Sequence, residues 1–285
     1  MDPSALDKLE EALVKGIADY MKKCGFSRAH LGLSGGLDSA LVAYLAGKAI
    51  GHENIVCISM PSRFSSQGSR DDAAALAANL GCRFETLPIE GCYSAFLSTL
   101  AGVFENRPFD TAEENIQSRI RGVLLMAFSN KFNSMLLCAS NKSEIAMGYC
   151  TLYGDTNGAL APIGDIFKTE AFALCRRANE RSRAKTDRDI IPQAIIDKPP
   201  SAELRPNQKD EDSLPPYDVL DAILKLYLNE KLSHGEIVSK GFDGGLVDRI
   251  VKTIERTGFK RRQMPPVLKV SPLGDGLTAS PAHLE

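Results

Sequence analysis

One short motif combines hydroxyl, small and acidic residues in an order that could bind a phosphate. It runs from Ser34 to Ser39 and reads S-G-G-L-D-S. An apolar run at 29–33 precedes it, and apolar residues at helical spacing follow over 41–50, so the pattern predicts a turn from a strand into a helix. The first N–H groups of a helix lack internal partners and carry partial positive charge, and glycines allow close approach of an anion. The motif therefore predicts a phosphate-binding loop.

The acidic residue of this loop, Asp38, predicts a metal ion. The lysine-bearing G-x-x-x-x-G-K-[ST] spacing is absent, and no third glycine follows at the offset of dinucleotide-binding turns. A carboxylate repels a phosphate unless a cation lies between them, and Mg²⁺ commonly takes one or two carboxylates together with phosphate oxygens. The alternative is an ordinary glycine-rich turn with an acidic residue in the first turn of its helix.

The composition excludes several classes of protein. The chain has 285 residues, 44% of them hydrophobic, which is typical of a globular protein with a substantial core. Its net charge of −2 gives no basic field for nucleic acid. No apolar run approaches the ~18 residues of a membrane span and no signal peptide is visible, so we expect a cytoplasmic protein with no membrane partner. The seven cysteines and four histidines lack ligand spacing, so neither zinc nor thiol catalysis is expected.

Buried-strand patterns alternate with helical patterns about four times in the first half of the chain. Strands are expected at 29–33, 55–58, 83–89 and 135–139. Helices are expected at 5–23, 41–50, 69–81, 93–101 and 111–128, with the caps Ser4 and Asp7, Ser69 and Asp72, and Thr111 and Glu114. The alternation predicts an α/β fold, namely one domain with a mainly parallel twisted sheet and helices on both faces. Ligands of such sheets bind beyond the carboxyl ends of the strands, where the loops 34–39, 60–66 and 140–144 would meet.

The second half of the chain has a different pattern. A basic cluster at 181–185 precedes the segment 197–216, which holds five prolines and few apolar residues. We predict that about 181–216 is mobile, either as plain disorder or as a lid that orders over a ligand. A helical C-terminal part should follow, with an apolar stripe over 220–227, a turn capped by Ser233 and Glu236 and a helix over 246–257. Residues 271–285 read as a loose tail.

Two further charged residues could serve the phosphate loop. Glu144 follows the last predicted strand and could face Asp38, which would complete a magnesium site with two carboxylates; the alternative is a glutamate that caps a helix. Lys168 opens a helix and could neutralise a phosphate, although a lone lysine is more often solvated. A helix N-terminus supplies only about half a charge. Departure of a pyrophosphate would therefore need both the metal and the lysine.

Two polar clusters could bind a second substrate. Asn115, Ser118 and Arg119 share one face of the helix predicted over 111–128, which is either a binding patch or a solvent face. Lys260 begins a run of three cations that could grip phosphate or interact with the dipole at a helix C-terminus.

The sequence resembles the NAD⁺ synthetase family of the N-type ATP pyrophosphatase superfamily. The loop alone is shared by the superfamily, but the ordered set of motifs is specific to the family and covers about residues 6–270, which we take as one synthetase domain of about 1–270. The matching pieces are 32–39, Met60 to Arg63, Glu114 and Asn115 with Arg119, Asn141 to Glu144, Tyr153 to Asp155, Lys168, and Phe259 to Gln263. The resemblance implies an adenine nucleotide alpha hydrolase-like fold. It also implies a ligase that forms a C–N bond by converting deamido-NAD⁺, ATP and ammonia into NAD⁺, AMP and pyrophosphate.

The resemblance also implies roles for individual residues. ATP would be bound by Gly32, Leu33, Ser34, Gly35, Gly36, Leu37, Asp38, Ser39, Met60, Arg63, Ala139, Lys168 and Ser201. Deamido-NAD⁺ would be bound by Asn115, Arg119, Glu144 and Lys260. Asp38 and Lys168 would be catalytic, and Asp38 and Glu144 would bind Mg²⁺. Family members are homodimers with the dinucleotide at the subunit interface, so a homodimer is expected here.

Four positions depart from the small, ammonia-using members of the family. Those members commonly carry lysine where Leu152 stands, aspartate near Ala159, threonine at Ala139 and histidine at Phe259. Except at Ala139, the chain is more similar to the synthetase half of the larger glutamine-using enzymes, but it has no room for their glutaminase. We therefore expect either a free-standing ammonia user or a chain that receives ammonia from a partner or a missing domain.

Two other functions remain open. The same loop chemistry could act on a tRNA base, but this would predict a basic surface and usually catalytic or metal-binding cysteines. A non-catalytic ATP sensor would need the loop alone, and the presence of Asp38, Glu144 and Lys168 argues against it.

Overall fold

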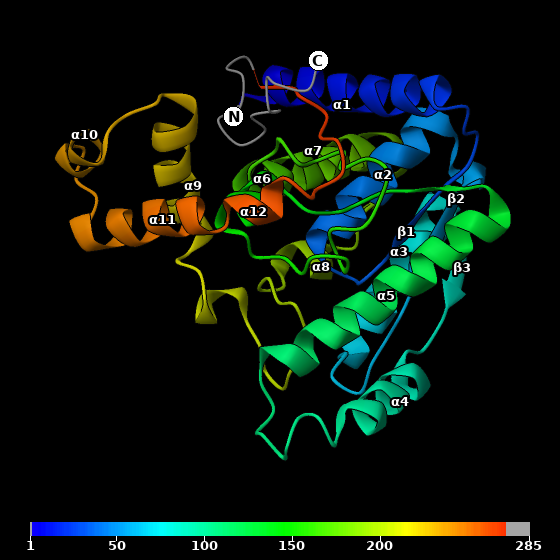
Figure 1. The fold of residues 1–285 in the computed structure, drawn as a ribbon. Helices are drawn as coiled ribbons and strands as arrows, with labels where there is room; N and C mark the ends of the chain where they lie inside the picture. Colours follow the sequence, from blue (N-terminus) through cyan, green and yellow to red (C-terminus); the bar gives the residue numbers. More distant parts are fainter. Residues whose placement is uncertain (1, 272–285) are drawn as a thin grey trace.

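The computed structural model describes residues 2–271, which form a parallel sheet between layers of helices (Figure 1). The strands are β1 (Ala29–Gly32), β2 (Ile55–Ser59), β3 (Arg83–Thr86) and β4 (Met135–Leu136). They lie in the order β3-β2-β1-β4, and every pair is parallel. The predicted α/β fold with a mainly parallel sheet is confirmed.

The register of the sheet brings the carboxyl ends of the strands to one edge. Gly32 at the end of β1 lies beside Ile58 near the end of β2. β4 is short, and the chain after it makes a bridge from Leu137 to Leu160, while Ala161 bridges to Val267. Residues 159–161 therefore lie next to β4, and a segment near the C-terminus pairs with them at the outer edge of the sheet.

The helices cover both faces of the sheet and then form a separate lobe. They are α1 (Pro3–Lys23), α2 (Leu37–Ile50), α3 (Gln67–Leu80), α4 (Glu90–Leu100), α5 (Thr111–Phe132), α6 (Lys142–Met147), α7 (Lys168–Thr186), α8 (Gln193–Asp197), α9 (Tyr217–Leu224), α10 (His234–Ser239), α11 (Gly244–Arg256) and α12 (Gly258–Arg261), with short 3-10 turns at His52–Asn54 and Asp210–Asp212 and a π-helical turn at Lys225–Asn229.

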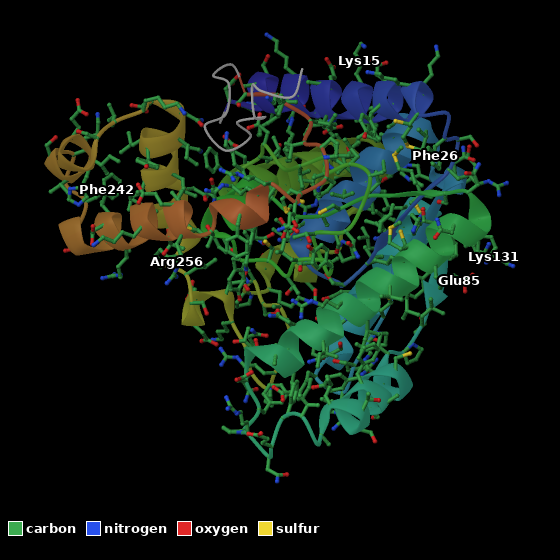
Figure 2. The ribbon with its side chains drawn as sticks, viewed as in Figure 1. Lys15, Phe26, Glu85, Lys131, Phe242 and Arg256 are labelled. Atoms are coloured by element: carbon green, nitrogen blue, oxygen red, sulfur yellow. The ribbon has the colours of Figure 1, made fainter. Side chains whose placement is uncertain are left out.

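Alternation along the strands supplies a core to each face. Ile55 and Cys57 of β2 pack with α2 and α3, whereas Ile58 packs with α4 and α5. The exposed side chains of Lys15 on α1 and Lys131 near the end of α5 mark the outer surfaces of the two helical layers (Figure 2). Helices α9 to α11 share a third core and project from the sheet region (Figure 1).

Three predicted helix caps are wrong. α1 begins at Pro3 after Asp2, because the fixed φ of proline suits the first helical position. The predicted cap residues Ser4 and Asp7 therefore lie inside the helix. Likewise Ser66, not Ser69, caps α3, and Asp110, not Thr111, caps α5.

In α3 and α5 an extended residue upstream already offers a side-chain oxygen to the first free N–H groups, so the helix starts earlier than the predicted cap. The predicted capping box of Ser233 with Glu236 is confirmed in α10.

The segment predicted to be mobile follows a defined path. α7 extends to Thr186, α8 and a 3-10 turn follow, and Ser201 reaches the cavity described below. Movement of this segment on ligand binding stays a prediction. Of the predicted tail, only Ser271 lies within the described residues. No helix in the described part of the chain is both long and apolar enough to cross a bilayer.

Candidate active site

The predicted phosphate loop is a strand-to-helix turn. β1 ends at Gly32, α2 begins at Leu37, and Gly36 occupies the N-cap position without a side-chain cap. Gly35 has φ +79°, and a Cβ at that position would lie 2.1 Å from the carbonyl oxygen of Ser69. Glycine is therefore required there both by the backbone conformation and by the packing of α3 against the loop.

Hydroxyl groups hold the loop in shape. The Oγ atoms of Ser34 and Ser39 lie 3.1 Å apart, the backbone N–H of Gly36 donates to Ser34 Oγ at 3.2 Å, and Ser39 Oγ donates to the Gly36 carbonyl at 3.0 Å. These bonds fix the turn at the start of α2, where a helix offers N–H groups to an anion.

A cavity of about 610 Å³ lies at the carboxyl ends of the strands, as predicted. All three loops that were expected to meet there contribute to its wall. The predicted ATP-site residues that line it are Gly32, Leu33, Ser34, Gly36, Leu37, Asp38, Ser39, Met60, Ala139, Lys168 and Ser201. The cavity is large enough for a nucleotide, because ligand sites commonly occupy ~300–1,000 Å³.

Lys168 joins the two predicted carboxylates in the wall of the cavity. Its Nζ donates to Asp38 Oδ2 at 2.5 Å and to Glu144 Oε1 at 3.2 Å. The lysine side chain is 3% exposed, compared with 17% for Asp38 and 16% for Glu144. The prediction that Glu144 faces Asp38 therefore holds, and a buried cation lies between them.

The cluster has more negative than positive groups. Burial, together with the charges of Asp38 and Asp210, raises the pKa of Glu144 to about 8 against the opposing effect of Lys168. Burial alone would lower the pKa of Lys168, but the charges of Asp38 and Glu144 outweigh it and raise that pKa. Burial also raises the pKa of Asp210. An additional cation would thus be stabilised here.

Glu144 caps a helix, which is one of the two roles that the sequence left open, and its place beside Asp38 is compatible with the other. It is the third residue of α6, and its Oε2 accepts from the N-cap backbone N–H of Asn141 at 3.4 Å. Its other oxygen accepts from Lys168. Asn141 is fully buried, and its Nδ2 donates to Asp38 Oδ1 at 3.0 Å. One cap therefore positions both carboxylates.

The cavity-facing side of α5 differs from the predicted patch. Asn115 and Ser118 line the cavity, but Arg119 is not among the lining residues, and its Nε donates to the Leu152 carbonyl at 3.2 Å. Arg121 lines the cavity instead, with its Nε donating to the Met60 carbonyl at 2.9 Å. Burial lowers the pKa of Arg121 to about 10, so it stays cationic at neutral pH.

Two predicted substrate contacts already have protein partners. Arg63 is half exposed, forms an ion pair with Glu90 and is not among the lining residues. Lys260 does line the cavity, where its Nζ donates to the carbonyls of Gly148 at 2.8 Å and Cys150 at 2.7 Å.

The sequence prediction missed several polar residues in the cavity wall. Arg121 was detectable, because Asn115, Ser118 and Arg121 recur every three residues on one helix face. Lys198, Glu203 and Asp210 carried no such signal, because they lie in an irregular segment rich in proline.

The donor set fits a magnesium ion that is shared with a nucleotide. Within residues 2–271 no group of three or more histidine, cysteine, aspartate or glutamate residues could hold a metal ion. Asp38 and Glu144 supply two oxygen donors beside the phosphate loop. Mg²⁺ commonly uses one or two carboxylates and completes its coordination with phosphate oxygens and water.

Comparison with known proteins identifies the family. The family model for NAD synthase matches residues 9–265. The chain belongs to the NAD synthase family. The glutamine-dependent NAD⁺ synthetase of Synechocystis sp. is 52% identical over 265 residues, which cover 93% of this chain and 46% of the relative. The chain therefore spans about half the length of this curated relative.

Two solved structures share the fold along nearly the whole chain. The NH3-dependent NAD synthetase from Campylobacter jejuni is 28% identical with a TM-score of 0.72, and the match covers 94% of this chain and 100% of that one. The NMN synthetase from Francisella tularensis is 25% identical with a TM-score of 0.74, covering 95% and 98%. NAD synthases are ligases that form a C–N bond and use ATP, which fits a phosphate loop at the end of β1.

Proposed function

We propose that the chain amidates deamido-NAD⁺ to NAD⁺, with ATP as the activating substrate and ammonia as the nitrogen donor. The observation that carries this proposal is the pairing of Lys168 with Asp38 and Glu144 beside the phosphate loop. A binding protein needs only the loop. A buried cation held by two carboxylates is instead suited to stabilising a leaving group, because preorganised charges lower the barrier where charge develops.

The proposed chemistry proceeds in two steps. A carboxylate oxygen of the nicotinate attacks the α-phosphorus of ATP, the bond to the bridging oxygen breaks, and pyrophosphate leaves. Ammonia then attacks the carboxyl carbon of the adenylate, AMP leaves, and one proton is released. Neither step needs a nucleophile from the protein.

The residues of the cavity would bind and orient these reactants. The start of α2, with Ser34 and Ser39, would hold the phosphates, and Lys168 would neutralise the departing pyrophosphate. Asn115 and Lys260 would contact the dinucleotide. The predicted contacts of Arg63 and Arg119 would require their present bonds to be exchanged for bonds to substrate.

Asp38 and Glu144 would hold Mg²⁺ when ATP is bound. The ion would supply charge neutralisation at the phosphate oxygens. In the absence of ligand, the raised pKa of Glu144 means that this carboxyl group holds a proton near neutral pH, so binding of the ion would be coupled to release of that proton.

The decisive assay mixes the protein with ATP, Mg²⁺ and deamido-NAD⁺ and supplies either ammonium or glutamine. Formation of NAD⁺ with ammonium alone is expected. NAD⁺ from glutamine at equal yield would show that the donor is wrong, and release of pyrophosphate without NAD⁺ would point to another acceptor. A tRNA-modifying enzyme would instead need a tRNA for pyrophosphate release, and an ATP sensor would release none.

A second candidate substrate is nicotinate mononucleotide. The similarity to an NMN synthetase along nearly the whole chain favours testing it. The same assay with the mononucleotide in place of deamido-NAD⁺ measures kcat/KM for both acceptors. We expect the dinucleotide to be preferred, because the 52% identical relative is an NAD⁺ synthetase.

We also propose that the protein is a homodimer in the cytoplasm. The dimer is supported by large apolar side chains that remain exposed in the layer of α4 and α5: Leu87, Phe96, Val103, Phe109, Val123, Met126 and Phe132. An apolar surface of this kind commonly marks an interface. The cytoplasmic location remains a prediction from the sequence.

The dimer can be tested by changing one residue of this surface. Val123→Asp should shift the mass measured by light scattering from dimer to monomer, because an unpaired charge in an apolar interface costs several kcal/mol. A monomeric wild-type protein at tens of micromolar concentration would contradict the dimer.

A further inference from the structure

The segment 198–205 crosses the cavity as a strap, and one carboxylate fastens it to α3. Glu203 Oε2 accepts from the backbone N–H of Ser66 at 3.0 Å, and Oε1 accepts from the hydroxyls of Ser66 at 2.9 Å and Ser69 at 2.7 Å. Ser66 is the N-cap of α3, so the carboxylate of Glu203 lies where a helix favours negative charge.

A second contact holds the strap at the same helix. Lys198 Nζ donates to Ser69 Oγ at 2.9 Å and to Asp72 Oδ2 at 2.9 Å. On the other side of the cavity, Gln117 of α5 donates to the carbonyl of Leu204 at 2.8 Å. The strap is therefore fixed at both ends. Ser201 lies between Lys198 and Glu203, the two residues that attach the strap to α3.

The backbone of Glu203 has an unfavourable conformation of the kind that proteins retain mainly at functional sites. Its φ is +50°, a conformation that non-glycine residues adopt at some energetic cost. The hydrogen bonds of the side chain offset that cost. The side chain of Glu203 thus holds the strap in its turn at this residue. The sequence pattern did not predict this role.

The attachment point of the strap also touches the phosphate loop. The carbonyl of Ser69 lies against Gly35, so closely that a Cβ at Gly35 would be 2.1 Å away. Glu203, the first turn of α3 and the loop therefore form one contiguous set of contacts. A shift of the strap would be transmitted to the place where we put the ATP phosphates.

We propose that Glu203 is a positioning residue, which clamps the strap onto α3 and thereby holds Ser201 in the wall of the cavity where we place ATP. In this proposal Glu203 acts through the strap and the phosphate loop, because both of its carboxylate oxygens are already bonded to Ser66 and Ser69. The inference rests on the proposed function for its kinetic consequence, but the clamp can be measured without any turnover.

The first measurement is hydrogen exchange in the ligand-free protein. Glu203→Ala removes all three acceptor contacts, so the hydrogen-bonded amides of Ser66, Lys198 and Leu204 should exchange at least about tenfold faster, and Glu203→Gln, which keeps one oxygen, should show a smaller increase. Glu211→Ala is the matched control, because Glu211 is exposed in the same segment and has no hydrogen bond or ion pair among the described residues. Exchange at the wild-type rate in Glu203→Ala would overturn the clamp.

The second measurement separates positioning from mere stability. Calorimetric titration with an unreactive ATP analogue should give a Kd about tenfold weaker for Glu203→Ala and unchanged for Glu211→Ala, and KM for ATP should rise more than kcat falls. Faster exchange with an unchanged Kd would reduce Glu203 to a structural role and overturn the proposal. If the wild-type protein bound the analogue but formed no NAD⁺, the proposed function would fail while the clamp stood. Glu203→Gln provides the same readouts if Glu203→Ala does not fold.

Discussion

Lys142 and Lys168 are both buried at the first position of a helix, but they differ in the number of carboxylates that surround them. Lys142 is the first residue of α6 and Lys168 the first residue of α7, where the helix dipole disfavours a cation. Lys142 is 1% exposed and bonds to Asp165 at 2.7 Å, and Lys168 is 3% exposed and bonds to Asp38 at 2.5 Å. The comparison separates an ion pair whose charges are matched from the cluster of Lys168, Asp38, Glu144 and Asp210, which we call the reactive cluster after its proposed role.

The pair around Lys142 is satisfied on all sides. Lys142 Nζ also donates to Asn229 Oδ1 at 3.2 Å, and Asp165 Oδ2 accepts from the backbone N–H groups of Val270 and Ser271 at 2.9 and 2.8 Å. One cation meets one carboxylate. Lys168 instead faces Asp38, Glu144 and the nearby Asp210, and its cluster borders the cavity. Only the cluster around Lys168 has more acidic groups than cations, so only this cluster can bind a further cation together with its ligand.

The largest effect should come from removing the cation of the reactive cluster. Lys168→Met should lower turnover by about 10³-fold or more, because the departing pyrophosphate loses a preorganised charge. Single-turnover release of pyrophosphate measures this loss. Circular dichroism and the melting temperature serve as controls for folding, and turnover within tenfold of the wild type would show that Lys168 is not catalytic.

The same substitution at Lys142 should mainly affect stability. Lys142→Met leaves Asp165 buried without its charge partner, so the free energy of unfolding should fall by about 3–5 kcal/mol. Guanidinium titration measures the change, and kcat per folded molecule should stay within a few-fold of the wild type.

The difference in the free energy of unfolding between the wild type and Lys142→Met should depend on pH if it comes from the ion pair with Asp165. Burial opposes the ionised form of Asp165, but the bonds from Lys142, Ser271 and Val270 outweigh it and lower its pKa. Its contribution to stability is therefore present above its ordinary pKa and is lost as the pH falls below that value. The gap between the wild type and Lys142→Met should narrow below about pH 4. A gap that is constant down to pH 3 would contradict the ionic explanation.

The reactive cluster should respond to pH with the opposite sign. Because the pKa of Glu144 is raised to about 8, the folded protein holds a proton that the unfolded chain releases, and stability rises as the pH falls from 8 towards 4.5. The ligand-free wild type should gain about 1–2 kcal/mol between pH 8.5 and pH 6 relative to Glu144→Gln. Parallel curves for the two proteins would refute this assignment.

The smallest effect is expected for an ion pair at the surface. Arg63 and Glu90 are both more than one-third exposed, so Arg63→Ala should change the free energy of unfolding by less than about 1 kcal/mol. The same variant tests the predicted contact of Arg63 with ATP. A KM for ATP that stays unchanged would remove Arg63 from the binding site.

Much of the fold and part of the site followed from local sequence patterns. The alternation of strands and helices predicted the parallel sheet, and the rule for strand ends brought together Asp38 and Glu144, which lie far apart in the chain. Lys168 was predicted separately, from its place at the start of a helix and from the family resemblance. The errors came from competition among similar signals. Ser69 and Thr111 are good cap residues, but Ser66 and Asp110 lie upstream and capture the free N–H groups first.

Residues whose position depends on tertiary packing were not predictable in this way. Glu203 and Asp210 reach the cavity because 197–216 folds back over it, and no periodicity marks an irregular segment. Arg119 shares a helix face with Asn115 at a spacing of four residues, whereas the cavity wall follows the spacing of three from Asn115 through Ser118 to Arg121. The sequence pattern contained both spacings, and only the packing of the helix selects between them.

The bridge between Ala161 and Val267 affects the order in which the protein can assemble during synthesis. The outer edge of the sheet, beyond β4 and residues 159–161, is closed by a stretch of chain that is synthesised long after β4. Asp165 also accepts bonds from the same late stretch, at Val270 and Ser271. A nascent chain halted before Val267 would therefore present an open edge to chaperones or to other unfinished chains. Tags and fusions inserted immediately before Val267 should lower the yield of folded protein far more than insertions between α4 and α5.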